Sequence, residues 1–162
     1  MRLTLTAFAL VMIGMGSSTV AVAKDDDGKI ELGKVPPAVR RAALKAVPGL
    51  KLTEAYMEDD EGETLYTLDG QLADDRDVEV EVTAKGEVLS VSIEIELRAV
   101  PKVVSTALRT KLKGFKPTAV MQVSEKGQIT SYAFEGKDAD GEEIDVTVTA
   151  DGSKVEVELD EG

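Results

Sequence analysis

The chain has 162 residues, no cysteine, no histidine and no tryptophan, and a formal net charge of -12 at pH 7. Without cysteine there is no disulfide, lipidated thiol or zinc-thiolate site, and without histidine there is no Ser-His-Asp triad or imidazole base. The negative charge disfavours nucleic acid and anionic lipid and favours basic proteins, basic peptides or cations as partners.

The N-terminus has the three regions of a secretory signal peptide. Arg2 precedes an apolar stretch, Leu3–Met15, and the small residues Ala21-Val22-Ala23 come before an abrupt charged run. The apolar stretch is shorter than the roughly 20 residues that span a bilayer. We therefore predict a signal peptide over residues 1–23, a secreted or periplasmic location in a bacterial envelope, and no stable membrane insertion after cleavage.

The segment that follows the signal peptide is rich in charge. Residues 24–34 contain aspartates, lysines and two glycines, with few apolar residues. Such a composition buries too little apolar surface to offset the loss of chain entropy on folding. We therefore predict a flexible acidic tail over residues 24–34.

Two helices are predicted from apolar residues at helical spacing. The first begins at Pro36, ends at Pro48-Gly49, and carries its apolar stripe on Val39, Ala42, Ala43 and Val47. The second begins at Pro101, ends at Lys113-Gly114, and carries the same stripe on Val104, Ala107, Leu108 and Leu112. Proline is tolerated in a first helical turn, and glycine is common just past a helix end.

Each predicted helix is followed by four predicted strands. The first lies near Leu52–Met57, or near Pro117–Val123 after the second helix, with unclear facing. The second carries Tyr66 and Leu68, or Tyr132 and Phe134; the third covers 78–84 or 144–150; the fourth covers 89–97 or 155–159. Apolar and polar residues alternate in the last two strands of each set, which indicates a sheet with one buried and one solvated face.

The elements recur because the sequence itself repeats. Val35-Pro36 matches Val100-Pro101, Tyr66–Gly70 matches Tyr132–Gly136, and Val78–Gly86 matches Ile144–Gly152, all in the same order. We predict an α+β fold of two tandem units, 35–97 and 98–162, within one compact domain. Each unit is a helix plus a four-stranded antiparallel sheet, with the helices on one face and the other face open.

These repeated motifs resemble a known family. The shared features are a helix begun by Val-Pro, a Pro-Gly end, Tyr-x-Leu-x-Gly, and a valine-rich strand running into Lys-Gly or Asp-Gly. Together they look like two tandem PepSY-like units of the beta-lactamase-inhibitor-protein-like (BLIP-like) family, over Val35 to Leu159. The resemblance implies a concave sheet face that binds another protein, and PepSY units are associated with binding or restraining exported peptidases. Because this chain lacks the inhibitor's disulfides and is poor in aromatic residues, beta-lactamase inhibition does not carry over, and the family supplies no catalytic residue.

The candidate partner-binding residues are the polar residues of the predicted open face. They are Glu79, Glu81, Thr83, Glu94, Glu96, Asp145, Thr147, Thr149, Glu156 and Glu158. One interpretation is an acidic cradle for a basic partner. The other is a solvated face whose charges prevent aggregation, as in many antiparallel sheets.

Other candidate sites have simpler structural explanations. Asp138-Ala139-Asp140-Gly141 has only the start of a calcium-loop spacing and is expected to form a turn. Tyr66 and Tyr132 are expected in the core. A pair of carboxylates can support glycoside cleavage, but the Glu-x-Glu pairs here are explained by strand alternation, and no pair stands out from its neighbours. We therefore predict no catalytic residue, no metal site and no cofactor.

The predicted function is that of an exported, non-catalytic module that binds or inhibits a protein or peptide through the open sheet face. The partner is expected to be basic or an exported peptidase. The alternative is a structural or cation-buffering envelope protein without a specific partner.

Overall fold

The computed structural model describes residues 28–60 and 62–159. This part of the chain forms two α-helices, two short 3-10 helices and one nine-stranded antiparallel sheet, with the strands in sequence order. The predicted signal peptide, 1–23, lies outside the described residues. The elements are β1 (Lys29–Ile30), η1 (Leu32–Lys34), α1 (Pro37–Ala46), β2 (Lys51–Asp60), β3 (Glu63–Gln71), β4 (Asp77–Thr83), β5 (Val88–Glu94), η2 (Leu97–Ala99), α2 (Lys102–Lys111), β6 (Lys116–Glu125), β7 (Gln128–Lys137), β8 (Glu143–Thr149) and β9 (Val155–Leu159).

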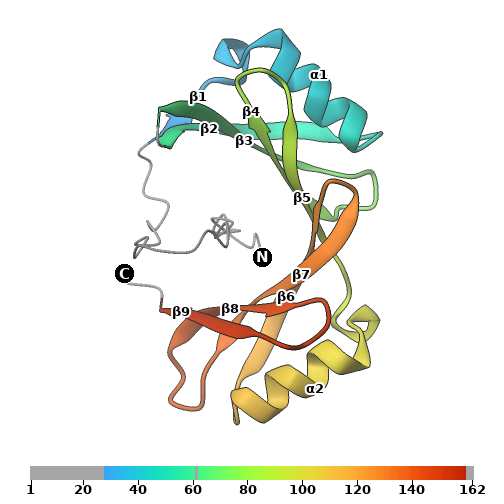
Figure 1. The fold of residues 1–162 in the computed structure, drawn as a ribbon, viewed down its shortest axis with the longest axis vertical. Coiled ribbons are helices and arrows are strands. Elements are labelled where there is room, and N and C mark those ends of the chain that lie inside the picture. The colour runs from blue at the N-terminus through green and yellow to red at the C-terminus, as the bar shows by residue number, and fades with distance from the viewer. Residues whose placement is uncertain (1–27, 61, 160–162) are drawn as a thin grey trace.

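The sheet is strongly curved, and both helices pack on its convex side (Figure 1). Val39 and Ala43 of α1 are fully buried against the sheet, as is Val104 of α2. The predicted apolar stripes are therefore the contact faces of the helices. Pro36 and Pro101 stand one position before the helices, at the N-cap, where a proline leaves no helical hydrogen bond unmade.

Two apolar cores lie between the helices and the sheet. The core under α1 contains Leu68 and the three valines of β4, Val78, Val80 and Val82. The core under α2 contains Phe134 and the matching residues of β8, Ile144, Val146 and Val148. The prediction of an α+β fold with an antiparallel sheet is confirmed, and the valine-rich strands are its buried centre.

The strands form one continuous sheet rather than two four-stranded sheets. β5 pairs with β6, with Ser92 opposite Val123 and Glu94 opposite Met121, so the two cores share a single sheet. Ile93 packs against the first core and Ile95 against the second. Joining the two halves leaves only two sheet edges where separate sheets would have four.

Part of the segment predicted as a flexible tail is ordered. Residues 28–34 include β1, whose Lys29 and Ile30 pair with Tyr56 and Ala55 of β2, and the 3-10 helix η1. Ile30 and Leu32 pack against the first core, which offsets the entropy cost of ordering this segment. Residues 24–27 lie outside the described part of the chain.

The fourth strand of the first half ends earlier than the alternation predicts. β5 ends at Glu94, and the chain turns into η2 with Glu96 as its N-cap, so Leu97 is exposed. Backbone angles here match those of η1: Glu96 has φ -70° and ψ 140°, and Glu31 has φ -66° and ψ 136°. The segment therefore follows the sequence match Glu31-Leu32 to Glu96-Leu97, rather than continuing the strand.

Candidate functional site: the concave face of the sheet

The concave face is the face of the sheet that lies opposite the helices. Because Val78, Val80 and Val82 point into the core, the intervening residues of β4 point into the concavity. Cross-strand register extends this assignment to the other strands. The predicted residues on this face are Glu79, Glu81, Thr83, Glu94, Asp145, Thr147, Thr149, Glu156 and Glu158.

Glu96 is predicted in a strand but is the N-cap of η2, so strand alternation does not place it on this face. It lies beyond the end of β5, where its carboxylate makes an ion pair with Arg98. Both side chains are largely exposed. The alternating residues Ile93 to Leu97 suggested a longer strand, but the 3-10 turn before α2 ends the alternation.

Two predicted residues hold turns together. The Thr83 hydroxyl accepts a hydrogen bond from the Glu87 N–H at 3.2 Å, across the turn between β4 and β5. The Thr149 hydroxyl donates to Asp151 Oδ1 at 2.7 Å and accepts from the Lys154 N–H at 3.0 Å, in the turn between β8 and β9. These hydroxyls therefore have a structural role that the sequence analysis did not identify.

A first group of carboxylates surrounds Glu81. Burial raises the pKa of Glu81, a hydrogen bond from Ser90 opposes this shift, and the charges of Glu58, Asp60 and Glu125 add to it. The Ser90 hydroxyl donates to Glu81 Oε2 at 3.2 Å, directly across the β4–β5 pair. This end of the concave face concentrates negative charge from β2, β4 and β6.

A second group, which we call the Glu135 cluster, consists of Asp77, Glu94, Glu135, Glu143 and Asp145. Burial raises the pKa of Glu135 to about 7, and the charges of the other four carboxylates contribute. Glu135 Oε1 is buried and has no hydrogen-bond partner among the described residues. The Asp77 N–H donates to Glu94 Oε2 at 3.2 Å, which holds one member in place.

The Glu135 cluster combines residues from both halves of the sheet, and sequence analysis identified only Glu94 and Asp145. Glu135 lies two residues after Ala133 in β7, where the predicted alternation rests on Tyr132 and Phe134 alone. The signal was present, since a polar residue following Phe134 in an alternating strand faces the solvated side.

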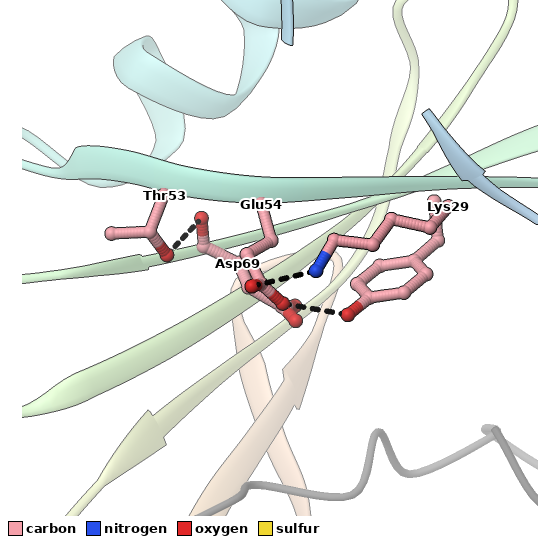
Figure 2. Close-up of polar contacts among 5 residues, drawn as sticks. Lys29, Thr53, Glu54 and Asp69 are labelled. Atoms are coloured by element: carbon pink, nitrogen blue, oxygen red, sulfur yellow. Dashed lines mark hydrogen bonds and ion pairs between the residues drawn. The ribbon is translucent and has the colours of Figure 1, made fainter. Parts of the chain in front are cut away.

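Lys29, Tyr56 and Glu54 form a third group, at the β1 end of the face. Lys29 Nζ lies 2.8 Å from Glu54 Oε1, and the Tyr56 hydroxyl donates to Glu54 Oε2 at 2.7 Å (Figure 2). The Thr53 hydroxyl donates to the main-chain oxygen of Asp69 at 3.3 Å. The Lys29–Glu54 ion pair ties β1 to β2 and partly neutralises the acidic surface there, and the Thr53 contact ties β2 to β3.

The middle of the concave face is apolar. Met121, Val123 and Ala133 form a buried cluster of their own, separate from the two cores under the helices. They alternate with Val120 and Tyr132, which face α2, so they lie on the opposite face of the sheet. The facing of β6 is unclear from the sequence, so this cluster is not predicted by it.

Two further residue sets have structural roles. Tyr66 and Tyr132 are buried in the two cores, as predicted. Asp138 Oδ1 accepts hydrogen bonds from the N–H groups of Asp140 and Glu142, at 2.8 and 3.0 Å, so it shapes the turn between β7 and β8. Across residues 28–60 and 62–159 no three acidic side chains converge as metal ligands, and no helix there has the length and apolar character to cross a membrane.

Comparison with known proteins shows a likeness of fold. No protein-family model and no curated protein matches the chain. It is similar to solved structures of a candidate periplasmic protein from Bacteroides eggerthii (TM-score 0.60, 18% identity, 77% of this chain and 90% of that one) and a DUF2874 family protein from Bacteroides uniformis (0.59, 18%, 75% and 88%). A BLIP-like protein from Bacteroides fragilis matches with TM-score 0.57 and 20% identity, over 80% of this chain and 92% of that one. At these identities the likeness is one of fold, and the chain therefore has a BLIP-like fold.

Proposed function

We propose that this protein is an exported, non-catalytic module that binds a protein or peptide partner through the concave face of its sheet. The supporting observation is that acidic side chains from both halves converge on this face. The face lies on the side of the sheet opposite the helices (Figure 1). Glu135 has carboxylate neighbours on both sides of the β5–β6 joint. Such clustering is costly for an isolated protein and is relieved when a cation approaches.

We also propose that the two halves are PepSY-like repeats of one unit. The matched backbone angles at Glu31 and Glu96, and the matched core residues of β4 and β8, support this. The signal-peptide pattern and the candidate periplasmic neighbour support a location in the bacterial envelope. A basic segment of an exported protein, a peptidase for example, is the partner whose charge fits best.

The test is affinity capture from an envelope fraction, followed by calorimetry with the purified partner. The concave-face variant carries Glu81→Gln, Glu94→Gln and Asp145→Asn, none of which lies on β9. Its control loses the same charge at exposed turn positions, through Asp75→Asn, Glu87→Gln and Glu142→Gln. We expect the concave-face variant to bind the partner at least about 10-fold more weakly, with the control unchanged, because only the first set lies on the proposed interface.

Equal affinities of the two variants would instead favour the alternative, an acidic envelope protein without a specific partner at this face. In that case the charges would act only through general solubility and weak cation binding.

A further inference from the structure

The joint between the two halves shows how this sheet accepts a further strand. β5 pairs with β6 along Ser90 to Glu94, and its concave-facing residues at the joint include Ser90 and Ser92. Both serines are buried, and Ser92 lies between Glu79 on β4 and Val123 on β6. Where β5 pairs with β6, the side chains on the concave side of β5 are therefore small and neutral.

β9 occupies the position in the second half that β5 occupies in the first. Glu156 and Glu158 lie opposite Thr147 and Asp145 of β8. Ser90 and Ser92 lie opposite Glu81 and Glu79 of β4. Under the repeat proposed above, Glu156 therefore corresponds to Ser90 and Glu158 to Ser92. The two small residues of β5 at the joint with β6 are thus matched by carboxylates in β9.

The outer side of β9 has no neighbouring strand within residues 28–60 and 62–159. A strand edge presents a row of main-chain N–H and C=O groups to any extended segment that fits beside it. Val157, on the helix-side face of β9, is 43% exposed, whereas the matching Val91 within the sheet is more covered. The edge thus combines main-chain hydrogen-bonding capacity, an exposed valine and two glutamates.

A second copy of this chain does not fit this edge. The strand that corresponds to β6 is β2, and the residues corresponding to Val123 and Glu125 are Glu58 and Asp60. Pairing β2 of a second copy with β9 would place Glu58 opposite Glu158 and Asp60 opposite Glu156. Like charges directly across two strands destabilise the pairing, and β1 already occupies part of the β2 edge.

We propose that the outer edge of β9 binds an extended basic segment of a partner protein by antiparallel strand addition. Lysine or arginine at alternate positions faces Glu156 and Glu158, and the intervening apolar residues lie beside Val157. This edge borders the concave face and shares Glu156 and Glu158 with it, but it also uses the main-chain groups of β9, and the assignment rests on the proposed repeat. Lys154 already contacts Glu156, but both side chains are substantially exposed, so the incoming cation displaces a weak ion pair.

The probe is the capped peptide Lys-Val-Lys-Val-Lys-Val-Lys. Its binding to the full-length mature protein is measured by calorimetry, and the residues it protects are identified by amide hydrogen exchange. A second peptide of identical charge carries N-methyl groups on the amides of one edge, which removes its strand hydrogen bonds. We expect the first peptide to bind and to slow exchange at Val155 to Glu158. The N-methylated peptide is expected to bind at least about 10-fold more weakly.

The protein variant Glu156→Ser/Glu158→Ser installs the residues of the internal joint, and Glu87→Ser/Glu142→Ser removes the same charge from exposed turns. We expect only the first to weaken binding by about 10-fold or more. Glu81→Gln/Glu94→Gln, on concave-face strands that do not adjoin β9, should leave it unchanged, so failure of the concave-face proposal is distinguishable. Equal binding of the two peptides, absence of protection in β9, or no binding of the first peptide would each overturn strand addition.

Discussion

Glu135 of β7 and Asp145 of β8 lie directly opposite each other in the cross-strand register, and both face the concavity. Opposed carboxylates destabilise a strand pair, and here burial and three further carboxylates raise the cost of ionising Glu135. The opposed carboxylates therefore lower the stability of the β7–β8 pair, and they lie on the face that we propose as the binding surface.

The raised pKa of Glu135 predicts that stability depends on pH. Its folded value of about 7 exceeds the ordinary 4.5, so the native state binds more protons between these values. The stability linked to this group is fully present below about pH 4.5 and is lost as pH rises through 7. We expect Glu135→Gln to stabilise the protein at pH 8 by about 1–2 kcal/mol, after discounting for partial exposure, and to have little effect at pH 4.5. Urea unfolding at both pH values measures this.

The control for this prediction is Glu142→Gln, which removes one carboxylate from an exposed position in the β7–β8 turn. It should change stability by less than about 0.5 kcal/mol at either pH. A shift for Glu135→Gln that is the same at pH 4.5 and pH 8 would contradict the assignment, because a packing effect does not follow the titration.

Gly70 and Gly136, the last residues of the Tyr-x-Leu-x-Gly motif, are predicted to be intolerant of alanine. A Cβ atom at Gly70 would lie 2.3 Å from the main-chain oxygen of Lys51, and one at Gly136 would lie 2.4 Å from that of Lys116. The neighbouring strand must move to accept it, so each substitution should cost about 1–3 kcal/mol. Thermal unfolding measures the loss. Gly33→Ala is the control, since nothing lies within 4 Å of its Cβ position.

Asp151 is predicted to titrate far below an ordinary aspartate. Hydrogen bonds from Ser153 and Thr149 hold its pKa at about 2, because they stabilise the ionised carboxylate in the β8–β9 turn. The stabilisation of the folded state by ionised Asp151 is present above pH 3.8, the pKa of the unfolded chain, and is lost as the pH falls through 2. An NMR titration of the carboxyl carbon should show this midpoint, and Ser153→Gly should raise it. A midpoint near 3.8 in the intact protein would show that the turn hydrogen bonds do not form in solution.

Local patterns predicted the helices, the hairpins and the buried strands, because each depends on nearby residues. Val39 and Val104 mark helix faces, and Val78 to Val82 alternate cleanly. Gly62 and Gly127 have φ of +88° and +78°, which favours glycine in the hairpin turns between β2 and β3 and between β6 and β7. The repeat also indicated which strands correspond, before any pairing was known.

The joint and the composition of the concave face were not predictable in the same way. Whether Ser92 meets solvent or Val123 depends on a pairing between residues far apart in the sequence. Glu135 gains its unusual environment from Asp77 and Glu94, which belong to the other half. These relationships exist only after the sheet has formed, so a pattern confined to one strand does not contain them.

Ser92→Glu is predicted to be the most damaging change at the joint between the halves. Ser92 is 4% exposed and lies directly opposite the buried Glu79, so a glutamate there adds a second buried carboxylate beside the first. We expect a loss of about 3 kcal/mol or more at pH 7 in urea unfolding. The mirror change in β9, Glu158→Ser, should be neutral or stabilising, because burial and Glu156 already raise the pKa of Glu158.

Ser92→Gln separates charge from size in this prediction. Glutamine has nearly the volume of glutamate but no charge, so it should destabilise clearly less than Ser92→Glu at pH 7, and the two should converge as the pH falls and the new carboxyl protonates. Equal losses for glutamine and glutamate at pH 7 would mean that the joint excludes bulk rather than charge. In that event the glutamates of β9 would also have to be explained by their size, and the proposed preference of its edge for a basic strand would lose its physical basis.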